Sequence, residues 1–222
     1  MAQDKDKKGG MRGLVIGMVV FVLLAGVGAS LLSKKTNTHA ATPSAVSKAD
    51  GYGIVFNPQG SPTVDIWEDF QCPICARFES INGSYIESLA RDNKVKVVFH
   101  PLSFIGPESI LAANAAGCSS EAGKFLEFHR SVYINQPAEN SGAITSTWLQ
   151  LLGAAAGIKS NKYINCVTKG SYYDWVKNIA ADGVTQKINS TPTVKINGKE
   201  LDRATQYMDS AAFKKAVTSA GA

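Results

Sequence analysis

Two cysteines, Cys72 and Cys75, stand where an apolar strand-like segment ends and a helical pattern begins. Residues 63–70 are rich in β-branched and aromatic side chains, and residues 76–93 repeat apolar side chains at the helical interval. A thiol at a helix start faces unpaired amides and the positive end of the helix dipole, which favour the thiolate. Pro73 fits the first helical turn, where the amide that proline lacks is not needed. The motif therefore predicts a strand–cysteine–helix junction with a nucleophilic thiol at position 72.

The order of the other segments predicts an α/β fold. Strand-like runs, at 53–56 and 94–104 besides 63–70, flank the first helical pattern. The sequence STPTVKINGKELD then predicts a strand, a turn at Asn197–Gly198 and a returning strand before a closing helix. This order indicates a thioredoxin-like fold made of residues 52–106 and 185–222, with a helical domain inserted at 107–184.

The N-terminal region predicts export of this domain. Residues 13–33 carry no charge, and at about 1.5 Å per residue they span about 30 Å, the thickness of a bilayer's hydrocarbon core. We expect one transmembrane helix there, with a cleaved secretory signal as the alternative. Basic residues outnumber acidic ones before the span and predict a cytoplasmic tail at 1–12. Residues 34–51 are small and polar and predict a linker. The domain is therefore expected outside the cytoplasm, as part of a single-pass membrane protein or as a secreted protein.

The charge distribution excludes a nucleic-acid partner. The chain has a net charge of +5, and residues 1–35 hold six basic against two acidic side chains, which accounts for +4. The rest of the chain is nearly neutral and offers no electrostatic surface for a polyanion.

Three interpretations of Cys72 and Cys75 are open: a redox pair, half of a metal site, or a structural crosslink. A zinc site commonly needs a second close cysteine pair, whereas Cys118 and Cys166 each stand alone. A copper site with one histidine remains possible, and a crosslink across so short a loop would constrain the unfolded chain little. The redox interpretation is favoured because the junction explains both thiols.

The other two cysteines, Cys118 and Cys166, both lie in the helical region. Exported proteins form disulfides, so we expect these two to form a structural disulfide, with two separate buried thiols as the alternative. His100 and His129 lie in separate segments and are expected to be packing or surface residues.

The sequence resembles the DsbA-like thiol:disulfide oxidoreductases of bacterial envelopes. The resemblance covers residues 52–220 and rests on FQCPIC, the helical insertion and STPTVKING. Segments such as FHPLSF and GKFLEFHRSVYINQPAEN are similar to the membrane-anchored Gram-positive branch. The resemblance implies that Cys72 attacks, that Cys75 resolves, and that Thr191 and the cis-proline Pro192 bind an extended substrate by its backbone.

Two positions depart from the family pattern. Many relatives carry a buried acid six residues before the first cysteine, and here that residue is Ile66. Glu68 has the same strand parity, so we expect it to accept the proton of Cys75. Strongly oxidising relatives have histidine where this chain has Ile74, and losing that donor would make the dithiol more reducing.

These observations together predict an extracytoplasmic enzyme that introduces disulfides into exported proteins. Its expected substrates are unfolded proteins with reduced cysteines, and its expected reoxidase is a quinone-linked membrane protein of the DsbB or vitamin-K-epoxide-reductase type. We expect a monomer whose only redox group is the Cys72–Cys75 pair, with no metal and no separate cofactor. The alternatives are an isomerase or reductase kept in the dithiol form, and a non-catalytic metal-binding or chaperone-like module.

Overall fold

The computed structural model describes residues 41–222. The predicted cytoplasmic tail, the transmembrane span at 13–33 and the first part of the linker therefore lie outside the described residues. Within residues 41–222, no helix combines the length and the apolar character that crossing a membrane requires.

A six-stranded mixed sheet forms the centre of the domain, in the order β1-β2-β4-β3-β5-β6. The strands are β1 (Val46–Ser47), β2 (Gly53–Phe56), β3 (Thr63–Asp69), β4 (Lys96–Leu102), β5 (Thr193–Ile196) and β6 (Lys199–Glu200). The two central strands β3 and β4 are parallel, and β2 and β5 flank them in antiparallel orientation. Asn197 and Gly198 both have positive φ angles and form the turn between β5 and β6.

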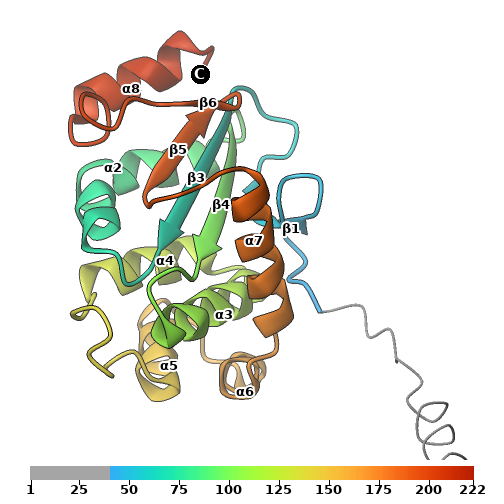
Figure 1. Ribbon diagram of the computed structural model, residues 1–222. Helices are drawn as coiled ribbons and strands as arrows, with labels where there is room; N and C mark the ends of the chain where they lie inside the picture. The colour runs from blue at the N-terminus through green and yellow to red at the C-terminus, as the bar shows by residue number, and fades with distance from the viewer. Residues whose placement is uncertain (1–40) are drawn as a thin grey trace, which may run out of the picture. The chain divides into compact units, whose positions relative to one another are not determined.

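The parallel pair is connected by α2 (Pro73–Arg91). This helix begins with Pro73 directly after Cys72 and buries one face, which includes Phe78, Ile86 and Leu89. Figure 1 shows α2 and α7 (Tyr173–Thr185) on opposite sides of the sheet. The closing helix α8 (Ser210–Ser219) packs on α2, where the rings of Phe78 and Phe213 lie 5.6 Å apart. The β3–α2–β4 unit thus fixes where the cysteine motif leaves the sheet.

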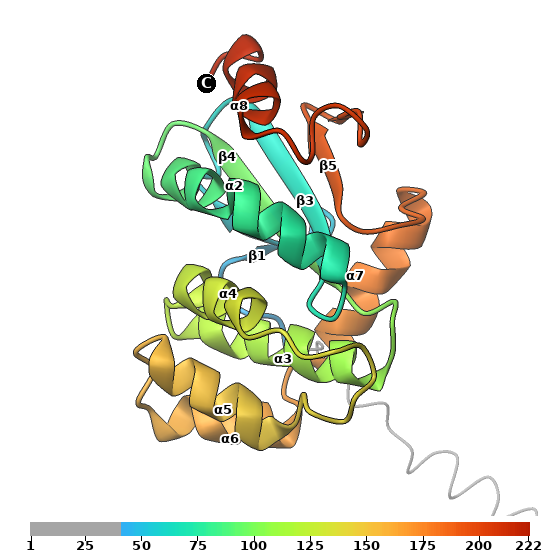
Figure 2. The same cartoon turned by 90° about the vertical axis from the view of Figure 1, so that its left-hand side faces the viewer.

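Five helices fill the chain between β4 and β5. They are α3 (Pro107–Glu121), α4 (Phe125–Ile134), α5 (Ser146–Ala155), α6 (Asn161–Lys169) and α7. Side-chain oxygens of Thr145 and Ser160 cap the first turns of α5 and α6, and Gly170 ends α6 in the left-handed conformation. Figure 2 shows α3, α4, α5 and α6 gathered together, with α4 the helix nearest to α2.

The predicted linker is too long at its C-terminal end. Val46 and Ser47 pair with Ile54 and Gly53 of β2, and the backbone amide of Ser44 donates to Glu121. Pro43 is buried. A strand of two residues is too short to show the alternation of apolar and polar side chains, so the sequence predicts a linker there.

Candidate thiol site at the start of α2

Cys72 is the N-cap residue of α2, and Cys75 lies one turn into the helix. Both are free thiols. Cys72 is 8% exposed and Cys75 is fully buried. The amide side chain of Gln136, which follows α4, donates to the carbonyl oxygens of Phe70 at 2.9 Å and Cys72 at 3.1 Å. The insertion therefore holds the chain that leads into the cysteine motif.

The surroundings of Cys72 favour its thiolate. A hydrogen bond from the Cys75 thiol is the largest cause, and hydrogen bonds from the side chain of Thr191 and from the backbone amides of Cys75 and Ile74 add to it. Burial opposes them, and the net result lowers the pKa of Cys72 to about 6. At pH 7 Cys72 is therefore mostly ionised, whereas an ordinary thiol with a pKa of about 8.5 is almost fully protonated.

The surroundings of Cys75 have the opposite effect. Burial raises its pKa first, and its hydrogen bond to Cys72 and the nearby charge of Glu68 raise the pKa further. The two thiols are thus differentiated: the surroundings of Cys72 favour the thiolate, and those of Cys75 favour the protonated thiol.

The segment before β5 reaches this site from more than a hundred residues away. The Thr191–Pro192 peptide bond is cis, and the carbonyl oxygen of Thr191 lies 3.6 Å from the sulfur of Cys72. Strand β5 begins at the next residue and pairs with β3, Val194 lying opposite Ile66. The sheet register therefore places the two segments that the sequence singled out side by side.

Asp69 is the last residue of β3, and its side chain holds the backbone around the end of this strand. The sequence alone does not predict this role. The carboxylate of Asp69 accepts hydrogen bonds from the amides of Gln71, Phe104 and Ile105 and from the hydroxyl of Ser109, at 2.7 to 3.1 Å. One buried carboxylate thus ties the residues before Cys72 to the connection that follows β4 and to the start of α3.

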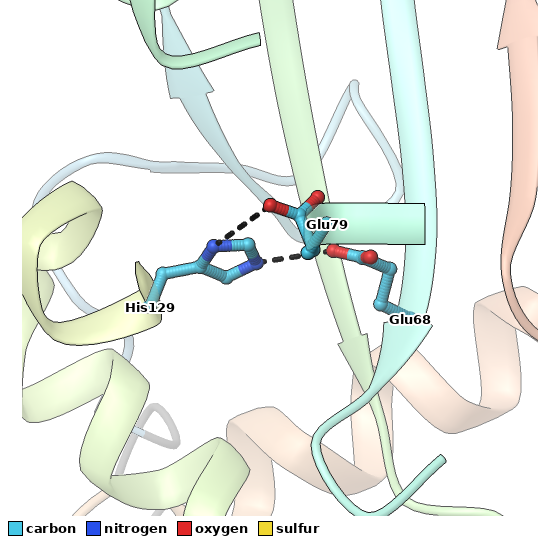
Figure 3. Close-up of side chains that lie close together, drawn as sticks. All are labelled: Glu68, Glu79 and His129. Atoms are coloured by element: carbon cyan, nitrogen blue, oxygen red, sulfur yellow. Dashed lines mark hydrogen bonds and ion pairs between the residues drawn. The ribbon is translucent and has the colours of Figure 1, made fainter. Parts of the chain in front are cut away.

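A cluster of three polar side chains lies behind the thiols. It consists of Glu68 on β3, Glu79 on α2 and His129 on α4 (Figure 3). The Nε2 atom of His129 is 3.0 Å from Oε2 of Glu68, and its Nδ1 atom is 3.8 Å from Oε2 of Glu79. The second carboxyl oxygen of each glutamate is buried without a hydrogen-bond partner among the described residues.

Burial sets the charge of this cluster. It raises the pKa of Glu68 to about 8 and that of Glu79 well above the usual value, and it lowers the pKa of His129. Burial thus favours the uncharged form of all three groups. Their polar atoms lie within 4.8 Å of one another, a spacing that a metal ion also tolerates. Because both imidazole nitrogens already face a carboxyl and burial favours the uncharged forms, we assign the cluster to proton chemistry.

Sequence reasoning found only part of this cluster. Glu68 is buried and acts on Cys75, whereas Ile66, at the position of the family's buried acid, is fully buried among apolar side chains. His129 was expected to be a packing or surface residue, and the structure places it against Glu68 instead. Glu79 was missed, although its spacing of four residues after Cys75 puts both on one face of α2.

The remaining predicted residues lie as follows. The side chain of Ile74 is 52% exposed beside Cys72. His100 is buried, stacks on Trp67 and lies 3.2 Å from Asp65, so it has no contact with the thiols. Cys118 of α3 and Cys166 of α6 are joined by a disulfide with an S–S distance of 2.05 Å.

Comparisons with known proteins agree with this geometry. A family model described as thioredoxin matches residues 52–217. None of the curated proteins searched matches the chain. Among solved structures, the MdbA thiol-disulfide oxidoreductase from Actinomyces oris is 21% identical with a TM-score of 0.70, the match covering 84% of this chain and 93% of that one.

Two further solved structures share the fold. BdbD from Bacillus subtilis is 23% identical with a TM-score of 0.65 over 81% of this chain and 97% of its own. DsbA from Mycobacterium tuberculosis is 24% identical with a TM-score of 0.60, and the match covers 80% of this chain and 90% of that one. The predicted thioredoxin-like fold of the DsbA kind is confirmed.

Proposed function

Because the chain belongs to the thioredoxin family, we propose that it is a thiol:disulfide oxidoreductase of the DsbA type that transfers the Cys72–Cys75 disulfide to exported proteins. The observation that carries this proposal is the difference between the two thiols: the pKa of Cys72 is lowered to about 6, and that of Cys75 is strongly raised. A disulfide whose reduced form holds a stabilised thiolate gives up its oxidising equivalent readily.

The transfer takes two exchanges. In the first, a substrate thiolate attacks the sulfur of Cys72, the Cys72–Cys75 bond breaks, and Cys75 leaves with the electron pair and takes up a proton. In the second, another substrate thiolate attacks the substrate sulfur of the mixed disulfide, and Cys72 leaves as a thiolate. The substrate is oxidised to a disulfide and the enzyme is reduced to the dithiol.

Reoxidation reverses the roles of the two cysteines. The Cys72 thiolate attacks a disulfide of the reoxidase, and Cys75 then resolves the mixed disulfide after it loses its proton. We assign Glu68 as the group that takes up this proton, because it is buried and lies close enough to Cys75 for its ionised form to raise the pKa of that thiol. A quinone-linked membrane protein of the DsbB or vitamin-K-epoxide-reductase type is the proposed reoxidase.

The proposed substrates are unfolded exported proteins with reduced cysteines. The carbonyl of Thr191 lies beside Cys72, so an extended substrate segment could pair with this backbone while its own sulfur meets Cys72. We place the enzyme outside the cytoplasm as a membrane-anchored monomer, with secretion after signal cleavage as the alternative.

Serine substitutions at the two cysteines test this function in the full chain. The Cys72→Ser variant should lose all oxidation of a reduced, unfolded substrate protein, because the disulfide that is transferred can no longer form. Mixed with the same substrate protein in its disulfide form, the Cys75→Ser variant should instead accumulate a mixed disulfide between Cys72 and the substrate, because Cys72 attacks that disulfide and the resolving thiol is missing. The species are separated by mass after an acid quench. Wild-type oxidation by both variants would rule out the redox function.

Measuring the Cys72–Cys75 potential against a glutathione buffer separates the oxidase from the second candidate, an isomerase or reductase kept in the dithiol form. Ile74 supports that candidate, because its side chain offers Cys72 no donor or charge. An oxidase requires a potential well above that of the glutathione pool, and a more negative potential would favour the reductase.

A further inference from the structure

The imidazole of His129 faces two carboxyl groups, those of Glu68 and Glu79, which also hydrogen-bond each other. Its Nε2 atom is 3.0 Å from Glu68 and its Nδ1 atom is 3.8 Å from Glu79, so each ring nitrogen faces a different carboxyl (Figure 3). The three side chains come from β3, α2 and α4 and are only 5% to 8% exposed. An imidazole can take a proton at one nitrogen and release one from the other.

The two ends of this cluster meet different surroundings. At one end, Glu68 lies close enough for its charge to raise the pKa of Cys75. At the other end, Glu79 and His129 line a cavity of about 310 Å³ whose walls also include the exposed residues Ser80 and Ile134. Glu68 is not part of that wall. The cluster therefore connects a buried thiol to a cavity that reaches the surface.

Resolution by Cys75 requires such a connection. The thiol is fully buried and its pKa is strongly raised, so water cannot deprotonate it directly. Glu68 is itself 4% exposed, and with a pKa of about 8 it is mostly protonated at pH 7. It must release its own proton before it can accept one from Cys75.

We propose that Glu79 and His129 are positioning residues that pass the proton of Cys75 between Glu68 and the cavity. This inference rests on the proposed redox function and extends it to a proton path. The path belongs to residues of the insertion and of α2 that lie outside the CPIC motif.

The chemistry balances as follows. Glu79 first releases a proton into the cavity; Nδ1 of His129 then gives its proton to Glu79 while Nε2 receives that of Glu68. The Cys75 thiol then protonates Glu68, its sulfur attacks Cys72 in the mixed disulfide, and the partner thiolate leaves with the electron pair. One proton moves from Cys75 to solvent in each reoxidation and leaves His129 protonated at Nε2; the reverse transfer returns a proton to Cys75 and restores the first tautomer when Cys75 leaves during substrate oxidation. The 3.8 Å separation exceeds a hydrogen bond, so the Glu79 side chain must approach by about 1 Å.

Few other charged groups surround the imidazole. Glu87 and Arg130 line the cavity and pair with each other at 2.6 Å. The phenol of Tyr133 has its pKa raised well above the usual value, first by burial, and stays protonated. The rings of Phe70, Phe99 and Phe125 pack against the imidazole. The cavity beside it is lined further by Leu126, Ser80 and Ser84, and His100 and Pro101 line a second, smaller cavity with it. The two glutamates of the cluster are therefore the groups placed to exchange protons with it.

Reaction of the dithiol full chain with saturating oxidised glutathione separates the two steps. Attack by Cys72 gives a glutathione mixed disulfide, and resolution by Cys75 then releases the second glutathione. Samples are quenched with acid at successive times, and mass spectrometry measures the rates of both steps at each pH from 6 to 9. In the wild type, the resolution rate should rise with pH and level off above about 8, as Glu68 ionises.

In Glu79→Gln and His129→Ala the rate of the resolution step should fall by about tenfold or more at pH 7. A positioned proton acceptor commonly raises a rate by roughly 10²–10⁴-fold, and these variants should lose part of that gain. The attack by Cys72 should stay within about twofold. The resolution rate should lose its plateau and rise in proportion to hydroxide. Added imidazole should restore the resolution rate of His129→Ala by entering the cavity.

Two matched controls exclude a merely structural effect. Glu87→Gln changes another carboxylate of the same cavity, and His100→Ala removes another buried histidine with a carboxylate partner. His100→Ala should keep the wild-type pH profile. The charge of Glu87 raises the pKa of Glu79 and of His129, so Glu87→Gln should shift the profile along the pH axis but keep its plateau. Neither variant should respond to imidazole. Should His129→Ala fail to fold, Glu79→Gln carries the test alone.

A resolution rate within about twofold of wild type in Glu79→Gln, or a slower rate with an unchanged pH profile, would overturn the proton path. If the wild type formed no mixed disulfide at Cys72, the proposed redox function itself would fail. The two failures are therefore distinguishable.

Discussion

At the scale of single residues, the site depends on how differently two similar thiols are surrounded. Cys72 receives hydrogen bonds from Cys75, from Thr191 and from backbone amides, and its pKa falls to about 6. Cys75 lies three residues on, is buried, and keeps its proton. Every donor to Cys72 except Thr191 comes from the first turn of α2, so the helix start sets most of the nucleophile's charge.

The residue that could still tune Cys72 is Ile74, whose side chain is half exposed beside it. In Ile74→His the imidazole should add a donor or a positive charge near the sulfur and lower the pKa of Cys72 below about 6. Each unit of that shift stabilises the thiolate by about 1.4 kcal/mol and raises the potential by about 30 mV. The pKa follows from alkylation rates against pH, and the potential from a glutathione redox titration.

Ile74→Phe is the control for this substitution, because it places a ring of similar size at the position without a donor. It should leave the pKa and the potential near their parent values. An equal shift in both variants would assign the effect to the loss of isoleucine.

At the scale of elements, the sequence predicted the parts of the site that follow one another along the chain. The apolar run of β3, the proline at the start of α2 and the Asn197–Gly198 turn are local signals, and the fold follows them. The cluster of Glu68, Glu79 and His129 has no such local signal, because Glu79 and His129 come together only through the packing of α4 against α2. No spacing within either helix predicts which residue of the other helix it will meet. The hydrogen bonds that Asp69 accepts from Phe104, Ile105 and Ser109 are equally absent from any local pattern, because those residues lie 35 to 40 positions away.

The disulfide between Cys118 and Cys166 joins α3 to α6 and closes a loop with a sequence separation of 48. Replacing both cysteines by alanine should lower the free energy of unfolding by about 4 kcal/mol, because the unfolded chain regains the freedom of that loop. Urea unfolding without reductant measures the loss. The exchange rate at Cys72 should stay within about twofold.

Loss of exchange activity in a variant that still folds would contradict a structural role for this pair. It would indicate instead that electrons pass between two redox pairs.

At the scale of the whole molecule, the thiol site draws together segments that are far apart in sequence. The cysteines come from α2, the cis-proline segment precedes β5, and the insertion supplies Gln136 and His129. Unfolding separates all of them, so the Cys72 thiolate loses its donors and its pKa returns to about 8.5. The redox state and the global stability of the domain are therefore linked.

This linkage gives a pH dependence with a definite sign. The pKa of Cys72 is lower in the folded dithiol form than in the unfolded chain, so its contribution is complete above about 8.5 and is lost as the pH falls through about 6. The disulfide form has no thiol at this position and lacks the contribution. Between pH 5.5 and 7.5 the free energy of unfolding of the dithiol form should therefore rise by about 2 kcal/mol relative to that of the disulfide form.

Urea unfolding of the two redox forms at both pH values measures this difference directly. Glu79 and His129 titrate in both forms. The Cys72 thiolate raises the pKa of Glu68 in the dithiol form only, so the comparison is made in the Glu68→Gln background as well. The Cys72→Ser variant isolates the cause, because its reduced form should show no such rise over the same pH range. If the difference in free energy of unfolding between the two wild-type redox forms did not change with pH, the fold would not lower the pKa of Cys72. A stabilised thiolate at the start of α2 could then not explain why the disulfide is transferred to substrates.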